Sequence, residues 1–156
     1  AARFPEASRS SRTSTSREVL IVVGSANSVS HEQADAVEKL SGFKLLRAPL
    51  DRTSDSASTL STLTQKAVSA LRTRRYGAVL ATGGDTMEAI LDALGIHCFW
   101  LAGEVEPGFP IGVADHGGQC LILGMKAGGF GNSETLVHAA KHLTSNREIV
   151  ACPIRL

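Results

Sequence analysis

The alternation of short apolar runs with helical patterns is the feature that most constrains how this chain can fold. Residues 19–23 form a continuous, mostly β-branched run that ends at Gly24, which is typical of a strand buried on both faces of a parallel sheet. Further short strands are predicted at residues 43–46, 78–81, 97–101, 111–114 and 120–123. A chain of 156 residues fits one domain and is long enough to bury a core.

Helical patterns fill the stretches between these runs. The clearest one has apolar residues at i, i+3, i+4 and i+7 and a glycine stop: Met87, Ile90, Leu91, Leu94 and Gly95. The other predicted helices run from a Ser30 cap to near Gly42, through residues 60–71, and from Asn132 or Ser133 to Leu143. Residues 51–59 are polar and irregular. This order predicts an α/β fold with a doubly wound, mainly parallel sheet and helices on both faces.

Composition and charge exclude several classes of function. Aromatic residues make up 4% of the chain, so the core must rest on aliphatic side chains. Four arginines and one glutamate give residues 1–17 a net charge of +3, and because the whole chain carries +1, the remainder carries −2. No nucleic-acid partner is therefore expected. No apolar stretch reaches the roughly 20 residues that cross a bilayer, so no membrane partner is expected either. The three cysteines form no CxxC pair.

Residues 1–17 differ in composition from the rest of the chain. They hold five serines, two threonines and four arginines with almost nothing apolar, so they cannot bury enough surface to offset the entropy of ordering. We expect a disordered linker at residues 1–17 and a folded domain at residues 18–156. The chain begins without Met, which suggests a fragment, and lacks the apolar region of a signal peptide, so we expect a cytoplasmic protein.

A first glycine turn joins the predicted strand at residues 78–81 to the clearest helix. It contains Gly83, Gly84, Asp85 and Thr86, and it lies beyond the carboxyl end of a strand, where parallel sheets bind ligands. Paired glycines let a ligand approach without meeting a Cβ, and the helix start offers unpaired N–H groups and a positive dipole end to phosphate. The alternative is a tight turn in which Asp85 and Glu88 form a capping box.

A second glycine turn, Lys-Ala-Gly-Gly-Phe-Gly at residues 126–131, also lies between an apolar strand and a helix. Three glycines in four residues are costly in backbone entropy, so a surface loop rarely carries them without need. Lys126 could counter a phosphate as a point charge, and Gly128 is a point of close approach. The alternative is a flexible loop with a solvated lysine, but two such turns together favour ligand binding.

Weaker signals lie elsewhere. The turn after residues 19–23 contains Ser25, a candidate donor to a phosphate or base, and lacks the GxGxxG pattern of NAD-binding folds. Glu104 is a candidate for holding a metal-bound water or a ribose hydroxyl, whereas Glu106 is expected to be solvated. His138 and His142 have metal-ligand spacing on one helix, but with no third ligand evident no metal site is predicted.

Taken in their order along the chain, these turns resemble the C-terminal nucleotide-binding domain of the four-carbon acid sugar kinase family. The matching pieces span about residues 18–145: Gly24-Ser25, residues 82–86, Gly103-Glu104 with Pro107-Gly108, and residues 126–131. The resemblance implies that residues 18–156 are the ATP-binding domain of a kinase acting on threonate, erythronate or oxo-tetronates. It also implies that Ser25, residues 83–86 and Gly128 contact ATP.

The resemblance further implies that the sugar-acid site and most catalytic groups belong to an N-terminal domain outside this chain. We therefore leave the catalytic residues unassigned and expect binding of ATP and Mg²⁺ without turnover by the chain alone. The stretch between Ser28 and Thr82 is shorter than the family pattern, which affects the adenine side of the site. The sequence leaves open whether the chain forms a homo-oligomer.

Three alternatives remain open at the level of sequence. The chain could be a non-catalytic module that binds a nucleotide or sugar phosphate, or a domain retained only for assembly. It could also be half of an NAD-dependent oxidoreductase, which the turn at residues 24–28 disfavours.

Overall fold

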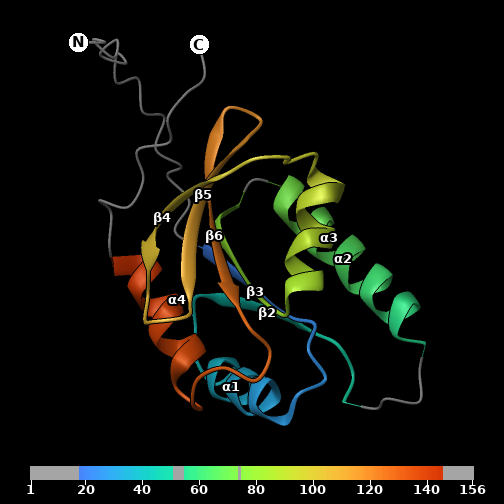
Figure 1. Ribbon diagram of the computed structural model, residues 1–156, viewed down its shortest axis with the longest axis vertical. Helices are drawn as coiled ribbons and strands as arrows, with labels where there is room; N and C mark the ends of the chain where they lie inside the picture. The colour runs from blue at the N-terminus through green and yellow to red at the C-terminus, as the bar shows by residue number, and fades with distance from the viewer. Residues whose placement is uncertain (1–17, 51–54, 74, 146–156) are drawn as a thin grey trace.

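The strands of this protein form a single sheet, which is covered by helices (Figure 1). The structure, a computed structural model, describes residues 18–50, 55–73 and 75–145, so the predicted linker at residues 1–17 and the last part of the predicted domain lie outside the described residues. In chain order the elements are β1 (Glu18–Val23), α1 (Ser28–Glu38), β2 (Phe43–Arg47), α2 (Ser56–Arg72), β3 (Tyr76–Thr82), α3 (Gly84–Leu94), β4 (Trp100–Glu104), β5 (Pro110–His116), β6 (Gln119–Lys126) and α4 (Thr135–Ser145).

The sheet has six strands in the order β2-β1-β3-β6-β5-β4. Strands β2, β1, β3 and β6 are parallel to one another, whereas β5 runs antiparallel to both of its neighbours, β6 and β4. Strand β4 therefore points the same way as β6, and the carboxyl ends of five strands meet at one edge, called here the carboxyl edge. The glycine turns that follow β1, β3 and β6 all lie at this edge.

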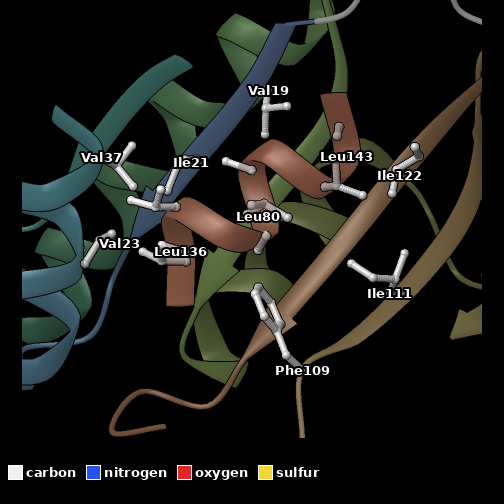
Figure 2. Packing of buried hydrophobic residues seen from close by; sticks show 14 of the residues in the cluster. Val19, Ile21, Val23, Val37, Leu80, Phe109, Ile111, Ile122, Leu136 and Leu143 are labelled. Carbon is white, nitrogen blue, oxygen red and sulfur yellow. The ribbon is translucent and has the colours of Figure 1, made fainter. Parts of the chain in front are cut away.

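The side chains of β1 divide between two cores, because successive residues of a strand point to opposite faces of the sheet. Val19, Ile21 and Val23 pack with α1 and α4, as Figure 2 shows. Leu20 and Val22 pack on the other face with α2 and α3. All five side chains are at most 2% exposed. The predicted α/β fold, mainly parallel with helices on both faces, is confirmed.

Two helices begin earlier than the sequence predicted, because an upstream side chain caps each of them. Helix α1 has Asn27 rather than Ser30 as its N-cap, and the Asn27 side chain accepts a hydrogen bond from Val29 N at 2.9 Å. Helix α2 starts at Ser56, where the Asp55 carboxylate accepts from Ala57 N at 3.1 Å. Residues 56–59, predicted to be irregular, are therefore helical.

The strand predicted at residues 97–101 lies further along the chain, at Trp100–Glu104. It is an edge strand of the sheet, and residues 97–99 are exposed, so burial does not hold them in the ladder. The stop predicted for α3 is confirmed, with Gly95 in the left-handed conformation at φ 70°. Among the described residues, no helix is long and apolar enough to cross a membrane.

Candidate functional site

Three glycine turns meet at the carboxyl edge. A Cβ on Gly24, after β1, would overlap the hydroxyl of Thr86 in α3, and a Cβ on Gly128, after β6, would lie 2.6 Å from Ser25 Oγ. The backbone N–H of Gly83 donates to the carbonyl of Lys126 at 2.9 Å, which joins the turns after β3 and β6. The fold thus brings Ser25 close to Gly128 and joins Gly83 to Lys126, although Ser25 and Gly128 lie about a hundred positions apart.

The start of α3 is open at this edge. Its N-cap is Gly83, whose φ of 93° favours glycine, and no side chain caps the helix. Asp85 lies inside the first turn and is exposed, so the alternative in which Asp85 caps the helix through a capping box is wrong. Because the first N–H groups of a helix have no intrahelical partners, the edge presents donors together with the positive end of the helix dipole.

The loop that follows β6 wraps its carbonyl groups around a buried ammonium. Lys126 is 2% exposed, and its Nζ donates to the carbonyls of Ala127, Gly128 and Phe130 at 2.7, 2.8 and 2.8 Å. The alternative of a solvated lysine on a flexible loop is therefore wrong. Burial lowers the pKa of Lys126 to about 8, and the carboxylate of Glu106 opposes this shift.

Two buried side chains of α1 hold the same loop. Ser30 Oγ donates to the carbonyl of Gly128, and Gln33 Nε2 donates to those of Phe130 and Asn132 at 3.1 and 2.6 Å. Ser30, predicted to cap the helix, instead lies inside α1, and the sequence contains no separate signal for Gln33. Their i, i+3 spacing places them on one helix face, but this pattern does not reveal that a loop almost a hundred positions away supplies their partners.

The inward carbonyls leave a row of N–H groups on the opposite side of the loop. Across a trans peptide the C=O and N–H bonds point in opposite directions, and no peptide bond among the described residues is cis. The carbonyls of residues 127, 128 and 130 therefore turn outward the N–H groups of Gly128, Gly129 and Gly131, here called the loop amides. Within the described chain, no hydrogen-bond acceptor pairs with them. Successive amides of this kind form anion-binding sites.

Two glutamates lie near the end of β4, Glu104 as its last residue and Glu106 in the connection to β5. Glu104 is exposed and accepts from Gly108 N at 3.4 Å. Glu106, which was expected to be solvated, is half-buried and accepts from Thr135 Oγ1 at 3.0 Å, so that prediction is wrong. The physical reason is the fully buried Phe109, which draws the β4–β5 connection against the core. Glu106 is thereby placed near the loop after β6.

Metal-binding side chains do not gather in the described part of the chain. No group of three His, Cys, Asp or Glu side chains there could hold a metal ion. On α4, His138 is exposed and His142 is half-buried. A divalent cation at the carboxyl edge would thus need ligands from elsewhere, and Mg²⁺ commonly combines one or two carboxylates with phosphate oxygens and water.

A cavity of about 370 Å³ opens at the carboxyl end of β2, between this strand and the first half of α2. Its lining combines apolar, hydroxyl and basic side chains: Leu45, Leu46, Arg47, Ala48, Pro49, Ser58, Thr59, Thr62, Leu63 and Lys66. The cavity volume is in the range of small-molecule sites. Since β2 neighbours β1 in the sheet, the cavity shares an edge with the glycine turns.

The fold and these turns define a class, the doubly wound α/β domains that carry glycine-rich turns at the carboxyl edge of the sheet. Residues 41–136 match the family described as the nucleotide-binding C-terminal domain. The match covers more than half of the chain, and the chain belongs to this family, which is that of the four-carbon acid sugar kinases. The resemblance inferred from the order of the turns is confirmed.

Three characterised relatives carry kinase names. The D-threonate kinases of Cupriavidus necator and Bordetella bronchiseptica are 41% and 42% identical over 71 residues, which cover 44% of this chain and 17% of each relative. The 3-oxo-tetronate kinase of Pseudomonas savastanoi pv. phaseolicola is 34% identical over 64 residues, which cover 41% of this chain and 15% of that protein. The similarity thus spans a small part of each relative.

Solved structures share the fold. A domain of unknown function from Bordetella bronchiseptica, a domain-swapped dimer with bound citrate, has a TM-score of 0.77 and 26% identity, covering 83% of this chain and 42% of its own. A Haemophilus influenzae protein, HI1011, has a TM-score of 0.66 and 16% identity, covering 86% of this chain and 42% of its own. The chain thus spans less than half of either structure.

Proposed function

We propose that the chain binds ATP with Mg²⁺, as the nucleotide-binding part of a kinase for four-carbon sugar acids of the threonate, erythronate or oxo-tetronate type. The observation that carries the proposal is the row of loop amides beside the uncapped start of α3. One helix-dipole contact contributes only about 0.3–1 kcal/mol, so a phosphate site needs several donors at once. The carboxyl edge supplies them from two turns that the fold holds together.

The proposed roles follow the positions of the side chains. Ser25, which lies against Gly128, would donate to a phosphate oxygen, and Gly83 and Gly84 would admit the phosphates to the start of α3. Thr86 closes the floor of the site against Gly24. The exposed carboxylate of Asp85 would share Mg²⁺ with the phosphates, and Glu104 would reach a ribose hydroxyl.

The nucleoside end of ATP would occupy the cavity between β2 and α2. Apolar walls formed by side chains such as Leu46 and Leu63 suit the faces of a base, and the cavity lies at the same edge as the loop amides. The stretch between Ser28 and Thr82, which is shorter than the family pattern, contains the residues that line this cavity, and we place the base there.

The remaining parts of the proposed activity lie outside this chain. A further domain, joined through a linker at residues 1–17, would hold the sugar acid and supply its catalytic groups. We place the protein in the cytoplasm, where ATP is available, and propose a homo-oligomer, as in the domain-swapped Bordetella bronchiseptica dimer.

Binding of three ligands tests the proposal. Thermal unfolding and calorimetry would compare ATP, inorganic tripolyphosphate and NADH, the first two with Mg²⁺. We expect ATP at a thousandfold excess over its Kd to stabilise the fold by about 4 kcal/mol, and tripolyphosphate to bind more weakly because it lacks a base. No effect of any ligand would refute nucleotide binding, stabilisation by NADH alone would indicate an oxidoreductase, and equal affinities for ATP and tripolyphosphate would refute the base cavity.

A further inference from the structure

Lys126 is an unusual lysine, because its charge is buried without an ion pair. Lysine is almost never fully buried unless it is paired, since a charge loses hydration in the interior. Here the Nζ has three hydrogen bonds, and all three go to carbonyls of the loop at residues 127–131 rather than to a carboxylate. The chain thus keeps a cation directly behind the loop amides.

The three carbonyls do not need Lys126 to be satisfied. The carbonyl of Ala127 also accepts from Phe130 N at 3.1 Å, that of Gly128 from Ser30 Oγ, and that of Phe130 from Gln33 Nε2 at 3.1 Å. A neutral side chain of similar length would leave each carbonyl with one donor. Lys126 adds one group that hydrogen-bonds to all three carbonyls at once, and it adds a positive charge.

We infer that Lys126 is a positioning residue for the proposed nucleotide site, which holds the loop carbonyls inward and sets its charge behind the loop amides to favour a bound phosphate. This inference rests on the proposed function. It differs from the direct phosphate contact expected from the sequence, because the ammonium acts through the peptide groups that it holds. The loop then binds a phosphate through its amides on one side and the Lys126 ammonium through its carbonyls on the other.

The surroundings of Lys126 set its pKa at about 8, so its charge changes with pH near that value. The charged group that acts on it among the described residues is Glu106, from the β4–β5 connection. From helix α1, the neutral side chains of Ser30 and Gln33 bind the same loop. The buried titratable residue of this helix is His31, which follows Ser30 in the sequence. Because the pKa of Lys126 lies at about 8, the free loop loses this charge as the pH rises above that value. A bound phosphate favours the charged form, so binding takes up a proton there.

The affinity for ATP with Mg²⁺ should therefore depend on pH in the full chain. By linkage, ATP should bind about tenfold more weakly at about pH 9 than at about pH 7, as measured by calorimetry. The Lys126→Met variant should bind at least about tenfold more weakly at pH 7 and should lose this pH dependence. Circular dichroism would check that the variant is folded, as the remaining donors to each carbonyl predict.

Lys141→Met, an exposed lysine on α4, is the matched control and should keep both the affinity and the pH profile. If Lys126→Met binds ATP like the unaltered chain at pH 7, the role of Lys126 is refuted while nucleotide binding stands. If the unaltered chain binds no ATP at all, the proposed function fails first. If the variant does not fold, a calorimetric pH titration of the unaltered chain replaces it, and an affinity for ATP that is the same at every pH at which the chain stays folded refutes the role.

Discussion

Glycine is required for different reasons at different positions of the site. Gly83 has a positive φ, and Gly24 and Gly128 each face a neighbouring side chain that leaves no room for a Cβ. Gly84 has neither constraint, since a Cβ there would meet nothing within 4 Å and its φ is ordinary. The fold alone does not explain a glycine at this position, whereas the approach of a ligand to the start of α3 would.

We therefore predict opposite effects of Gly84→Ala on stability and binding. Without ligand, alanine should stabilise the protein by about 0.4–1 kcal/mol, because it has less conformational freedom to lose on folding than glycine. The affinity for ATP should nevertheless fall about tenfold, since the methyl group occupies the approach to the first amides. Chemical unfolding and calorimetry measure the two effects. Ser61→Ala, on the exposed surface of α2, is the control that should leave affinity unchanged; retained ATP affinity in Gly84→Ala would contradict the site.

At the scale of single residues, the sequence predicted which turn a residue lies in better than it predicted which way the side chain points. It placed Lys126 and Gly128 in one turn, which the structure confirms, yet it expected the lysine to face a phosphate and Glu106 to face solvent. The direction of Glu106 depends on Thr135, 29 positions away. The carbonyls that Lys126 contacts lie only one to four positions away, but they are held inward by Ser30 and Gln33 of α1, which lie almost a hundred positions away. Local patterns contain no information about such partners.

At the scale of elements, Gly24 at the end of β1 and Thr86 in α3 form a close contact between the two elements. Gly24→Ala should destabilise the fold by about 1–3 kcal/mol, because its methyl group would overlap the Thr86 hydroxyl. Thr86→Ala removes that hydroxyl, so the double variant should lose less than the sum of the two single changes, by about 0.5 kcal/mol or more. Urea unfolding of the four proteins measures this coupling. Strict additivity would show that the two positions do not meet.

The elements themselves were largely predictable, but their arrangement was not. Apolar periodicity identified every helix and strand of the described chain, and the errors at α1, α2 and β4 concern their ends. The insertion of β6 between β3 and β5 left no local signal, because strand order depends on which apolar faces remain to be covered. That insertion places the loop of residues 127–131 beside Ser25, so the composition of the candidate site followed from sequence while its assembly did not.

At the scale of the whole molecule, we predict nucleotide binding without sugar-acid turnover. The described residues offer amides for phosphates but no base placed for a sugar hydroxyl, and phosphoryl transfer depends on positioning both reactants. The chain should bind ATP yet not phosphorylate threonate or erythronate above background in a coupled assay. The D-threonate kinase of Cupriavidus necator is the positive control. Robust phosphorylation by this chain alone would contradict the proposal that a further domain holds the sugar acid and supplies its catalytic groups.

The anchoring of the loop to α1 also affects how the protein folds. The hydrogen bonds from Ser30 and Gln33 join residues that lie 97 to 99 positions apart, so they form only after most of the described chain has left the ribosome. Contacts of such long range require the closure of a long loop, and folds that depend on them form more slowly than folds made of local contacts. A nascent chain that ends before β6 has no loop to anchor, and ATP would therefore select fully folded molecules over partly folded ones.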